Sequence, residues 1–532
     1  MNVTINDRNY DSYKYDGDCD INPSILKLFN KDQISLDTKK IISSPTRSNI
    51  IPGILVLEGG KTFGRKDNKG KLLYRCIPND TCLPIFLIPY EIKNIHFLKL
   101  FPNQYILFKF SEWKEKHPIG MITQTIGCVE NNEAFYEYQL YCKNLYIPIS
   151  NFNLATKKSL ELHSYEKYIE QIIEKYNVED RTSYRVFSID PEGSLDFDDA
   201  FSINKNILSI YISNVTLWLD ILNLWDSFSE RVSTIYMPNK KYPMLPTILS
   251  DNICSLKANQ KSFAFTMDIN MDTFEIKYSN TMINPYKNYC YEDPALLKDT
   301  NYILIKESCN ILQKSIIVSY NMNIIDSHDI VSYLMITMNY YTSKELLKFN
   351  NGIFRTAKKN NMDIDCDESI KNFMLIYNST AGEYKNLDSK NQNSKNDSVA
   401  HEMLGLDSYI HITSPIRRLV DILNIIQFQQ NTGMVTSDNM NCFYLVWITK
   451  LDTINIMMKK IKRVQSDCIL LHHFTNSTKL IYDGYGIDNE TVYIPELKST
   501  FHVKTELGKC KVKLYLFKNE DKLKSKIRLM IL

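Results

Sequence analysis

Short apolar runs divided by turn residues dominate the chain between about residues 50 and 150. Glycines, prolines and an Asn-Asp pair separate them, and this spacing is typical of small β-barrels, in which short strands alternate with tight turns. The first fifty residues are more polar and are expected to be partly extended. The apolar runs are Ile54–Leu57, Leu72–Ile77, Pro84–Ile88, Gln104–Phe110 and Ala134–Cys142.

Between about residues 164 and 475 the pattern alternates between helical and extended segments, which predicts a mixed α and β domain. Helix-like runs cover Ile330–Phe349 and residues 440–474. The polar stretch Asn386–Ser398 is expected to be a loop outside any packed layer. From residue 476 the chain returns to short strands. The predicted fold class is therefore α+β with several domains.

The composition agrees with a large globular protein. Of its residues, 44% are hydrophobic and 23% are charged, as in globular proteins. A chain of 532 residues is too long for a single hydrophobic core. A net charge of +2 does not indicate nucleic-acid binding, although a local basic channel is compatible with it. The twelve cysteines form no Cys-x-x-Cys pair, so neither a zinc knuckle nor a redox motif is indicated.

The sequence contains no secretory segment and no apolar run of about 18 residues. We therefore expect no membrane partner and a cytoplasmic protein, with a nuclear, organellar or viral setting left open.

Four aspartates lie within ten residues in the run from Ser188 to Ala200, among apolar neighbours. Carboxylates that share a small volume raise one another's pKa unless a cation holds them together. Oxygen ligands suit Mg²⁺ or Mn²⁺, and the usual chemistry of such a centre is phosphodiester hydrolysis. On these residues alone, a turn in which some carboxylates face water is about equally compatible. The four are Asp190, Asp196, Asp198 and Asp199.

Two further segments extend this pattern. Residues 234–256 contain Tyr-Met-Pro, Pro-Met-Leu-Pro and Cys-Ser-Leu, and residues 409–421 contain Tyr-Ile-His-Ile-Thr-Ser-Pro-Ile-Arg-Arg. With the aspartate run, they resemble three ordered signatures of the ribonuclease II (RNB) family. Within that family the chain resembles the exosome-type and stand-alone 3′→5′ exoribonucleases without an N-terminal endonuclease domain.

The resemblance implies an RNB catalytic domain flanked by OB-fold β-barrels. Two cold-shock-like barrels would precede the catalytic domain, and one short, degenerate OB fold would follow it. The implied domains are an N-terminal extension (1–49), a first OB fold (50–100), a second OB fold (101–163), the RNB domain (164–475) and a C-terminal OB fold (476–532).

The resemblance also implies a role for each aspartate. The residues that align with Asp190 and Asp199 are metal ligands, and Asp196 supports the site through metal or water. Asp198 aligns with the carboxylate whose loss stops cleavage while RNA remains bound. Whether the site uses one or two metal ions stays open.

Arginines and tyrosines complete the implied site. One member of the pair Arg417 and Arg418 would contact the scissile phosphate, since guanidinium groups bind phosphate oxygens in a bidentate manner. Which of the two does so stays open. Tyr236 aligns with an aromatic that packs against the terminal nucleotide, and Tyr291 resembles a second such tyrosine. A buried tyrosine with a satisfied hydroxyl is the structural alternative for both.

The predicted function is therefore a metal-dependent hydrolytic 3′→5′ exoribonuclease that degrades single-stranded RNA to nucleoside 5′-monophosphates. Several positions depart from the family pattern. Leu419 replaces a tyrosine, Ser262 an arginine and Lys462 a glutamate that can contact a ribose hydroxyl, and Ile425-Ile426 stands where the family usually has a His-Arg pair. These departures leave an alternative, a catalytically weak or inactive RNB homologue that acts as an RNA-binding module. Broadened activity on DNA would follow only from Lys462.

Overall fold

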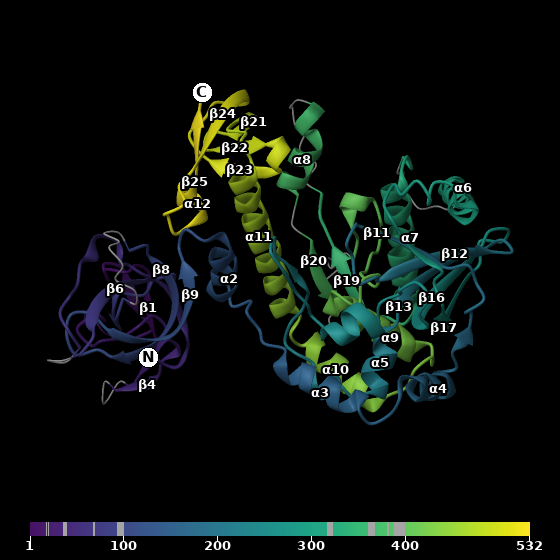
Figure 1. Ribbon diagram of the computed structural model, residues 1–532, viewed down its shortest axis with the longest axis horizontal. Helices are drawn as coiled ribbons and strands as arrows, with labels where there is room; N and C mark the ends of the chain where they lie inside the picture. Colours follow the sequence, from purple (N-terminus) through teal and green to yellow (C-terminus); the bar gives the residue numbers. More distant parts are fainter. Residues whose placement is uncertain are drawn as a thin grey trace. The chain divides into compact units, whose positions relative to one another are not determined.

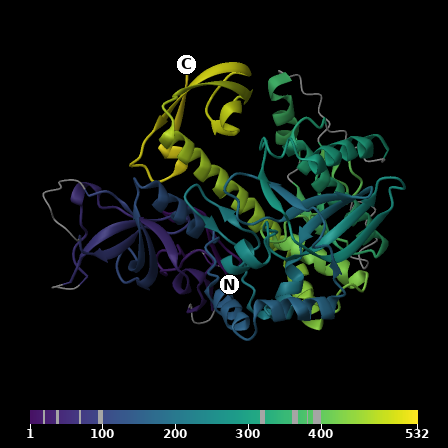
Figure 2. The ribbon, with the colours of Figure 1, turned by 45° about the vertical axis from the view of Figure 1, so that its right-hand side comes forward.

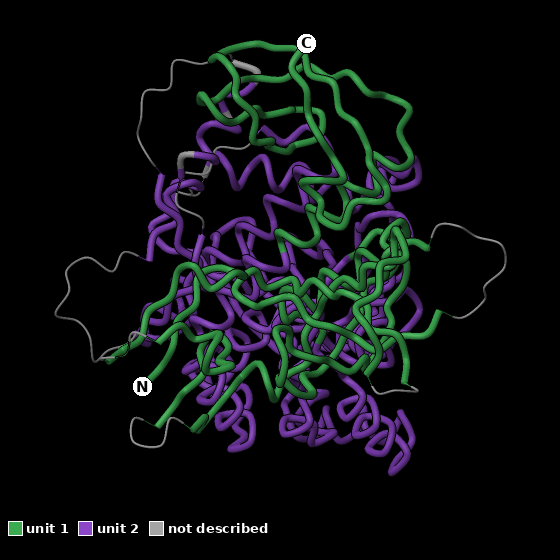
Figure 3. Tube along the Cα trace, turned by 90° about the vertical axis from the view of Figure 1, so that its left-hand side faces the viewer, with its two compact units in different colours: residues 1–146, 237–240, 462–532 green, residues 147–236, 241–461 purple. Residues whose placement is uncertain are grey.

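The computed structural model describes residues 1–17, 19, 21–35, 40–66, 70–92, 101–315, 323–359, 368–379, 382–387 and 399–532. Most of the polar stretch predicted as a loop, residues 388–398, lies outside these ranges. The chain divides into two compact units (Figure 3). Unit 1 comprises residues 1–146, 237–240 and 462–532, and unit 2 comprises residues 147–236 and 241–461.

A closed five-stranded barrel forms one part of unit 1 (Figure 1). Its interior is filled by alternating apolar side chains such as Phe86, Ile106 and Phe108. The strands, in barrel order, are β5 (Ile51–Leu55), β6 (Leu72–Pro78), β7 (Phe86–Tyr90), β9 (Ile119–Cys128) and β8 (Gln104–Glu112).

This barrel corrects the prediction of two N-terminal OB folds. Strand β5 pairs with both β6 and β8, and β9 pairs with both β7 and β8. Strands from residues 50–100 and from residues 101–163 therefore close the same barrel, and it is the only closed barrel among the described residues. The predicted boundary at residue 100 falls inside it.

The segment Ala134–Cys142, expected to be a strand, is a helix. In α2 (Asn132–Cys142), the side chain of Asn131 accepts hydrogen bonds from the backbone N–H groups of Glu133 and Ala134 and so caps the first turn. Phe135 and Tyr138 are buried on one side of this helix. The strand prediction rested on the spacing of short apolar runs between turn residues, and a short apolar run is compatible with a helix as well as a strand.

The N-terminal segment is packed into unit 1 through short paired strands and a small core of its own. Val3, Ile5 and Leu28 are buried in that core, while the ring of Phe29 stacks on Phe86 in the barrel. The elements are β1 (Val3–Ile5), β2 (Tyr13–Tyr15), β3 (Gln33–Ile34), β4 (Ile41–Ser43) and α1 (Pro45–Ser48).

The C-terminal segment forms a curled antiparallel sheet in the order β23-β22-β21-β24-β25, in place of the expected OB barrel. Lys526, which is buried, donates hydrogen bonds to the carbonyl oxygens of Val129 and Lys518, and the hydroxyl of Tyr105 donates to the carbonyl of Asp521. The bonds to Val129 and from Tyr105 join the C-terminal segment to the barrel region within unit 1, while the bond to Lys518 stays within the C-terminal segment. The elements are β21 (Ile481–Asp488), β22 (Thr491–Ile494), β23 (Ser499–His502), β24 (Gly508–Leu516), α12 (Leu523–Lys526) and β25 (Ile527–Ile531).

Unit 2 is built on a seven-stranded mixed sheet in the order β10-β17-β16-β13-β12-β11-β18. The pairs β10–β17 and β11–β18 are parallel, and the other neighbours are antiparallel. Two separate two-stranded antiparallel sheets, β14–β15 and β19–β20, lie outside this sheet. The strands are β10 (Glu179–Asp180), β11 (Phe187–Asp190), β12 (Asp199–Asn204), β13 (Ile207–Ser213), β14 (Ile235–Tyr236), β15 (Lys241–Tyr242), β16 (Ser262–Asn270), β17 (Ile276–Ile283), β18 (Lys287–Cys290), β19 (Ile353–Thr356) and β20 (Glu383–Asn386).

Helices α6, α7 and α9 contribute to the main core on one face of this sheet (Figures 1 and 2). Side chains of β13 alternate between the faces: Leu208, Ile210 and Ile212 face the helices, while Tyr211 packs on the opposite face. Helix α7 confirms the helix expected at residues 330–349, and α10 and α11 confirm the one expected at 440–474. The helices are α3 (Ser150–Leu160), α4 (Tyr165–Tyr176), α5 (Val215–Ile221), α6 (Thr300–Ser315), α7 (Ser327–Lys348), α8 (Glu368–Asn378), α9 (Leu419–Asn431), α10 (Asp438–Ile448) and α11 (Leu451–Asn476), which continues into unit 1.

Within the described ranges, no helix has the length and apolar character that crossing a membrane requires.

Gly120 allows strand β9 to lie close to the barrel core. A Cβ atom at this position would lie 2.6 Å from Phe108 Cδ2 and 2.7 Å from Ile88 Cδ1, both on fully buried side chains. We expect Gly120→Ala to lower the free energy of unfolding by about 1–3 kcal/mol because of overpacking, measured by urea denaturation. The control is Gly17→Ala, whose Cβ would have its nearest neighbour at 3.4 Å, Met1 Sδ. Equal stability of the two variants would contradict this packing.

Candidate active site

The aspartate run forms a strand, a turn and a second strand at the centre of unit 2. Strand β11 ends at Asp190, and β12 begins at Asp199 and runs antiparallel to it, with Phe187 opposite Phe201. The connecting turn contains Gly193, whose φ of +79° favours glycine. Asp190 and Asp199 therefore lie at the adjacent ends of two paired strands.

Asp190 and Asp199 each have a carboxylate oxygen without a hydrogen-bond donor. The Oδ2 atom of both residues is buried and unpartnered. Burial raises the pKa of both carboxyl groups, and the charge of Asp190 raises the pKa of Asp199 further. Buried, unpaired carboxylate oxygens are costly unless a cation binds them. These two residues thus have the chemistry of ligands for a hard divalent cation.

Among the described residues, no three or more His, Cys, Asp or Glu side chains are grouped so that they could hold a metal ion. The carboxylates with unpartnered oxygens at this position are the two of Asp190 and Asp199. Such a pair fits Mg²⁺ or Mn²⁺, because Mg²⁺ usually retains several waters and binds through one or two carboxylates plus substrate phosphates. The other two aspartates of the run are bonded to groups of the chain itself.

Asp198 is held by the segment that begins helix α9. It is 4% exposed; its Oδ1 accepts a hydrogen bond from the backbone N–H of Ile416 at 2.9 Å, and its Oδ2 from Nε of Arg417 at 3.1 Å. Burial raises the pKa of Asp198 to about 7, although Arg417 and the N–H of Ile416 act in the opposite direction. The side chain of Arg417 is 47% exposed and also donates to Oγ of Ser414 at 3.1 Å. The guanidinium of Arg417 is thus held by two hydrogen bonds, while nearly half of the side chain surface is exposed to solvent.

The neighbouring arginine has a different partner. Nη2 of Arg418 donates to Oδ1 of Asp421 at 2.9 Å, and Asp421 is fully buried in the first turn of α9. The same carboxylate oxygen accepts the backbone N–H of Ser414 at 2.7 Å. Arg418 therefore contributes to fixing the loop and helix that position Arg417.

Asp196 is bonded by the hairpin β14–β15. The hydroxyl of Tyr236 donates to its Oδ2 at 3.0 Å, and Nζ of Lys241 donates to its Oδ1 at 3.1 Å. Lys241 also lies 2.9 Å from Oδ1 of Asp251. Sequence reasoning missed Lys241 and Asp251. The pairing of Tyr236 with Lys241 across the hairpin brings Lys241 to Asp196, and Asp251 meets Lys241 from the separate turn Leu249–Ile253.

Tyr291 lies beside the two unpaired aspartates. Its backbone N–H donates to the carbonyl of Asp190 at 3.2 Å, and the charges of Asp199 and Asp190 add to the effect of burial in raising its pKa. Its ring is stacked on that of His328, with 3.6 Å between centroids and 9° between planes. His328, in the first turn of α7, was also missed, since one histidine at a helix start carries no sequence signal.

The family model described as "RNB domain" matches residues 178–302 and 302–432. The chain belongs to the RNB family. The matched residues include the four aspartates, both tyrosines and both arginines predicted from the sequence.

Comparisons with individual proteins agree with this RNB assignment. Ribonuclease R of Helicobacter pylori is 24% identical over 363 residues, which cover 54% of this chain and 55% of that protein. The chain thus matches about half of the length of this curated relative. The apo structure of Mycoplasma genitalium RNase R superposes with a TM-score of 0.69 at 16% identity, covering 95% of both chains. Yeast Ssd1, described as a pseudonuclease, has a TM-score of 0.56 at 14% identity, covering 89% of this chain and 67% of that one. At these identities the structures show a shared fold.

The positions that depart from the RNB pattern differ in their surroundings. Leu419 is fully buried at the start of α9. Ser262 is buried in β16 and donates to the carbonyl of Ser255 at 3.2 Å. Lys462 belongs to unit 1, on the part of α11 that lies outside the RNB match.

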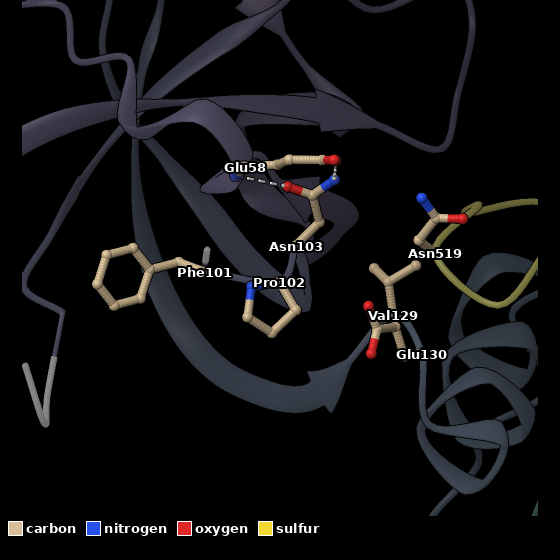
Figure 4. Close-up of a pocket in the computed structure, with 7 residues that line it drawn as sticks. All are labelled: Glu58, Phe101, Pro102, Asn103, Val129, Glu130 and Asn519. Atoms are coloured by element: carbon tan, nitrogen blue, oxygen red, sulfur yellow. Dashed lines mark hydrogen bonds between the residues drawn. The ribbon is translucent and has the colours of Figure 1, made fainter. Parts of the chain in front are cut away.

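A cavity of about 290 Å³ lies in unit 1, outside the RNB domain (Figure 4). Asn103 lines this cavity. The Oδ1 atom of Asn103 accepts hydrogen bonds from the backbone N–H groups of Leu57 and Glu58, so this side chain amide fixes a turn. No basic side chain lines the cavity, and none of the predicted site residues does. The lining residues are Glu58, Phe101, Pro102, Asn103, Val129, Glu130 and Asn519.

Proposed function

We propose that this chain is a metal-dependent 3′→5′ exoribonuclease that hydrolyses single-stranded RNA to nucleoside 5′-monophosphates. The observation that carries the proposal is the pair Asp190 and Asp199, whose buried oxygens have no donor, next to the Asp198–Arg417 ion pair. Membership of the RNB family supports the reaction class.

Asp190 and Asp199 would hold one divalent cation, Mg²⁺ or Mn²⁺. When bound, such an ion supplies an activated water and neutralises the charge that develops on the phosphate. Asp198 orients Arg417 through Nε, which leaves the exposed side of the guanidinium available to a phosphate oxygen. Arginine remains charged at every working pH, so this contact needs no proton transfer.

Tyr236 and Tyr291 are proposed to stack against RNA bases. Tyr236 is 37% exposed, and Tyr291 already stacks on His328. Every base has a π-face, so stacking holds a strand without selecting its sequence. The structure of Mycoplasma genitalium RNase R in complex with ribose-methylated single-stranded RNA, which has a TM-score of 0.68 to this chain, supports single-stranded RNA as the ligand class.

A second candidate function is RNA binding with little or no cleavage. The observation that favours it is the Asp196 carboxylate, both of whose oxygens are bonded to side chains of the protein. The likeness to yeast Ssd1, a pseudonuclease, points the same way. Against it stand the unpartnered oxygens of Asp190 and Asp199 and the exposed guanidinium of Arg417.

The two functions predict different results in a time course on 5′-labelled single-stranded RNA with Mg²⁺, with Mn²⁺ and with a chelator. The exoribonuclease should shorten the RNA to a very small labelled product in either metal, and the chelator should stop the reaction. The double variant Asp190→Asn/Asp199→Asn should leave the RNA intact in every lane. RNA that stays bound and uncut by the wild-type protein would instead support the binding function.

A further inference from the structure

Lys241 places a positive charge inside the acidic cluster. Its Nζ lies 3.1 Å from Oδ1 of Asp196 and 2.9 Å from Oδ1 of Asp251. Asp251 belongs to the π-helical turn Leu249–Ile253 and also accepts a hydrogen bond from Oγ of Ser250 at 2.6 Å. The side chains of Lys241, Asp196 and Asp251 are 21%, 12% and 18% exposed. Such an ammonium is fixed between two carboxylates and is largely shielded from water.

Tyr236 provides the other donor to Asp196. In the hairpin β14–β15, Tyr236 lies directly opposite Lys241, so both side chains extend toward the same carboxylate. Each oxygen of Asp196 therefore has a donor from the chain itself. A divalent cation that bound Asp196 would also come close to the Lys241 ammonium and would be repelled by it.

The carboxylates of Asp190 and Asp199 differ from that of Asp196 in their hydrogen bonding. Each has a buried oxygen with no donor, and no third acidic, histidine or cysteine side chain joins them in a metal-binding group within the described ranges.

We propose that the Lys241 ammonium takes the place of a second divalent cation beside Asp196, so that the acidic cluster binds a single metal ion at Asp190 and Asp199. The proposal rests on the proposed function and specifies its metal requirement. In two-metal phosphodiesterases, two cations about 3.5–4 Å apart share the charge of the reacting phosphate. Here the chain supplies one of the two positive charges, so its supply does not depend on the concentration of metal ions.

The test counts Mn²⁺ ions bound to the full-length, metal-stripped protein without RNA, by isothermal titration calorimetry and by the electron paramagnetic resonance of bound Mn²⁺. The wild-type chain is expected to bind one Mn²⁺. Lys241→Met should bind a second Mn²⁺, because Asp196 and Asp251 lose their common cation. The second ion should be lost again in Lys241→Met/Asp251→Asn.

Two control variants are informative: one keeps the positive charge at position 241, and the other removes a lysine charge at the neighbouring position. Lys241→Arg retains a cation between the carboxylates and should bind one Mn²⁺. Lys240→Met removes the neighbouring exposed lysine, whose Nζ lies 3.8 Å from Oε2 of Glu137, and should also bind one. If Lys241→Met fails to fold, Lys241→Gln serves as a second neutral variant, because its amide can still donate to one carboxylate. Lys241→Gln should bind two Mn²⁺ ions.

Two Mn²⁺ ions in the wild-type protein would overturn the inference about Lys241, as would a single ion in a folded Lys241→Met or Lys241→Gln variant. A wild-type protein that binds no Mn²⁺ would contradict the proposed metal pair itself. The count in the wild-type protein therefore separates failure of this inference from failure of the proposed function.

Discussion

Asp198→Asn is expected to reduce the rate of RNA cleavage by up to about 10³-fold, the effect of losing Arg417 itself, while the affinity for RNA stays close to that of the wild type. The asparagine has nearly the same size and can still accept the backbone N–H of Ile416. It removes the charge that holds Nε of Arg417, so the guanidinium loses its fixed orientation beside the metal pair. The variant should fold, because a neutral amide costs less to bury than a carboxylate.

The measurement combines single-turnover cleavage with fluorescence anisotropy on the same labelled RNA. The control is Asp272→Asn, an exposed aspartate in a turn whose carboxylate accepts hydrogen bonds from Nδ2 of Asn206. It should cleave at the wild-type rate. An Asp198→Asn protein that cleaves as fast as this control would remove Asp198 from the proposed chemistry.

Arg417→Ala is expected to reduce cleavage by about 2–4 kcal/mol of transition-state stabilisation, or roughly 30- to 10³-fold. The reason is the loss of an exposed, pre-oriented guanidinium at the position proposed for the scissile phosphate. RNA affinity should change less than the rate, since the contact is proposed to strengthen as charge develops. Single-turnover rates at saturating protein concentration measure this effect.

Arg418→Ala is the matched variant, and its expected effect is on stability. It leaves Asp421, a fully buried carboxylate, with the N–H of Ser414 as its remaining partner among the bonds at this site. Breaking a buried ion pair on one side costs about 3–5 kcal/mol in the free energy of unfolding, which urea denaturation can measure. If Arg418→Ala loses activity at unchanged stability and Arg417→Ala does the reverse, the assigned roles are exchanged.

The sequence predicted the family and the positions of the aspartates because the information is local. A run of thirteen residues determines a strand, a turn and a second strand, and the signatures around Tyr236 and Arg417 are equally short. The partner of each carboxylate was not predictable. Asp198 bonds to Arg417, 219 positions away, and Asp196 to Lys241, 45 positions away, so both contacts depend on the tertiary fold.

The number of N-terminal barrels was not predictable for a related reason. Alternating apolar residues indicate strands but do not show which strands close on one another. The pairing of β5 with β8 joins residues about fifty positions apart across the predicted boundary. In α2, the capping side chain of Asn131 is a helix signal that the prediction from apolar spacing did not include.

Unit 1 contains both the first and the last segments of the chain, and this has a consequence for synthesis on the ribosome. The carbonyl of Val129 receives its bond from Lys526, which is made 397 residues later. The hydroxyl of Tyr105 likewise donates to the carbonyl of Asp521, which is made 416 residues later. Contacts between such distant positions form slowly, because a long loop must close before they stabilise anything. A nascent chain therefore carries an incomplete unit 1 until residue 526 has been made, and a chain that stops before residue 521 never completes these bonds.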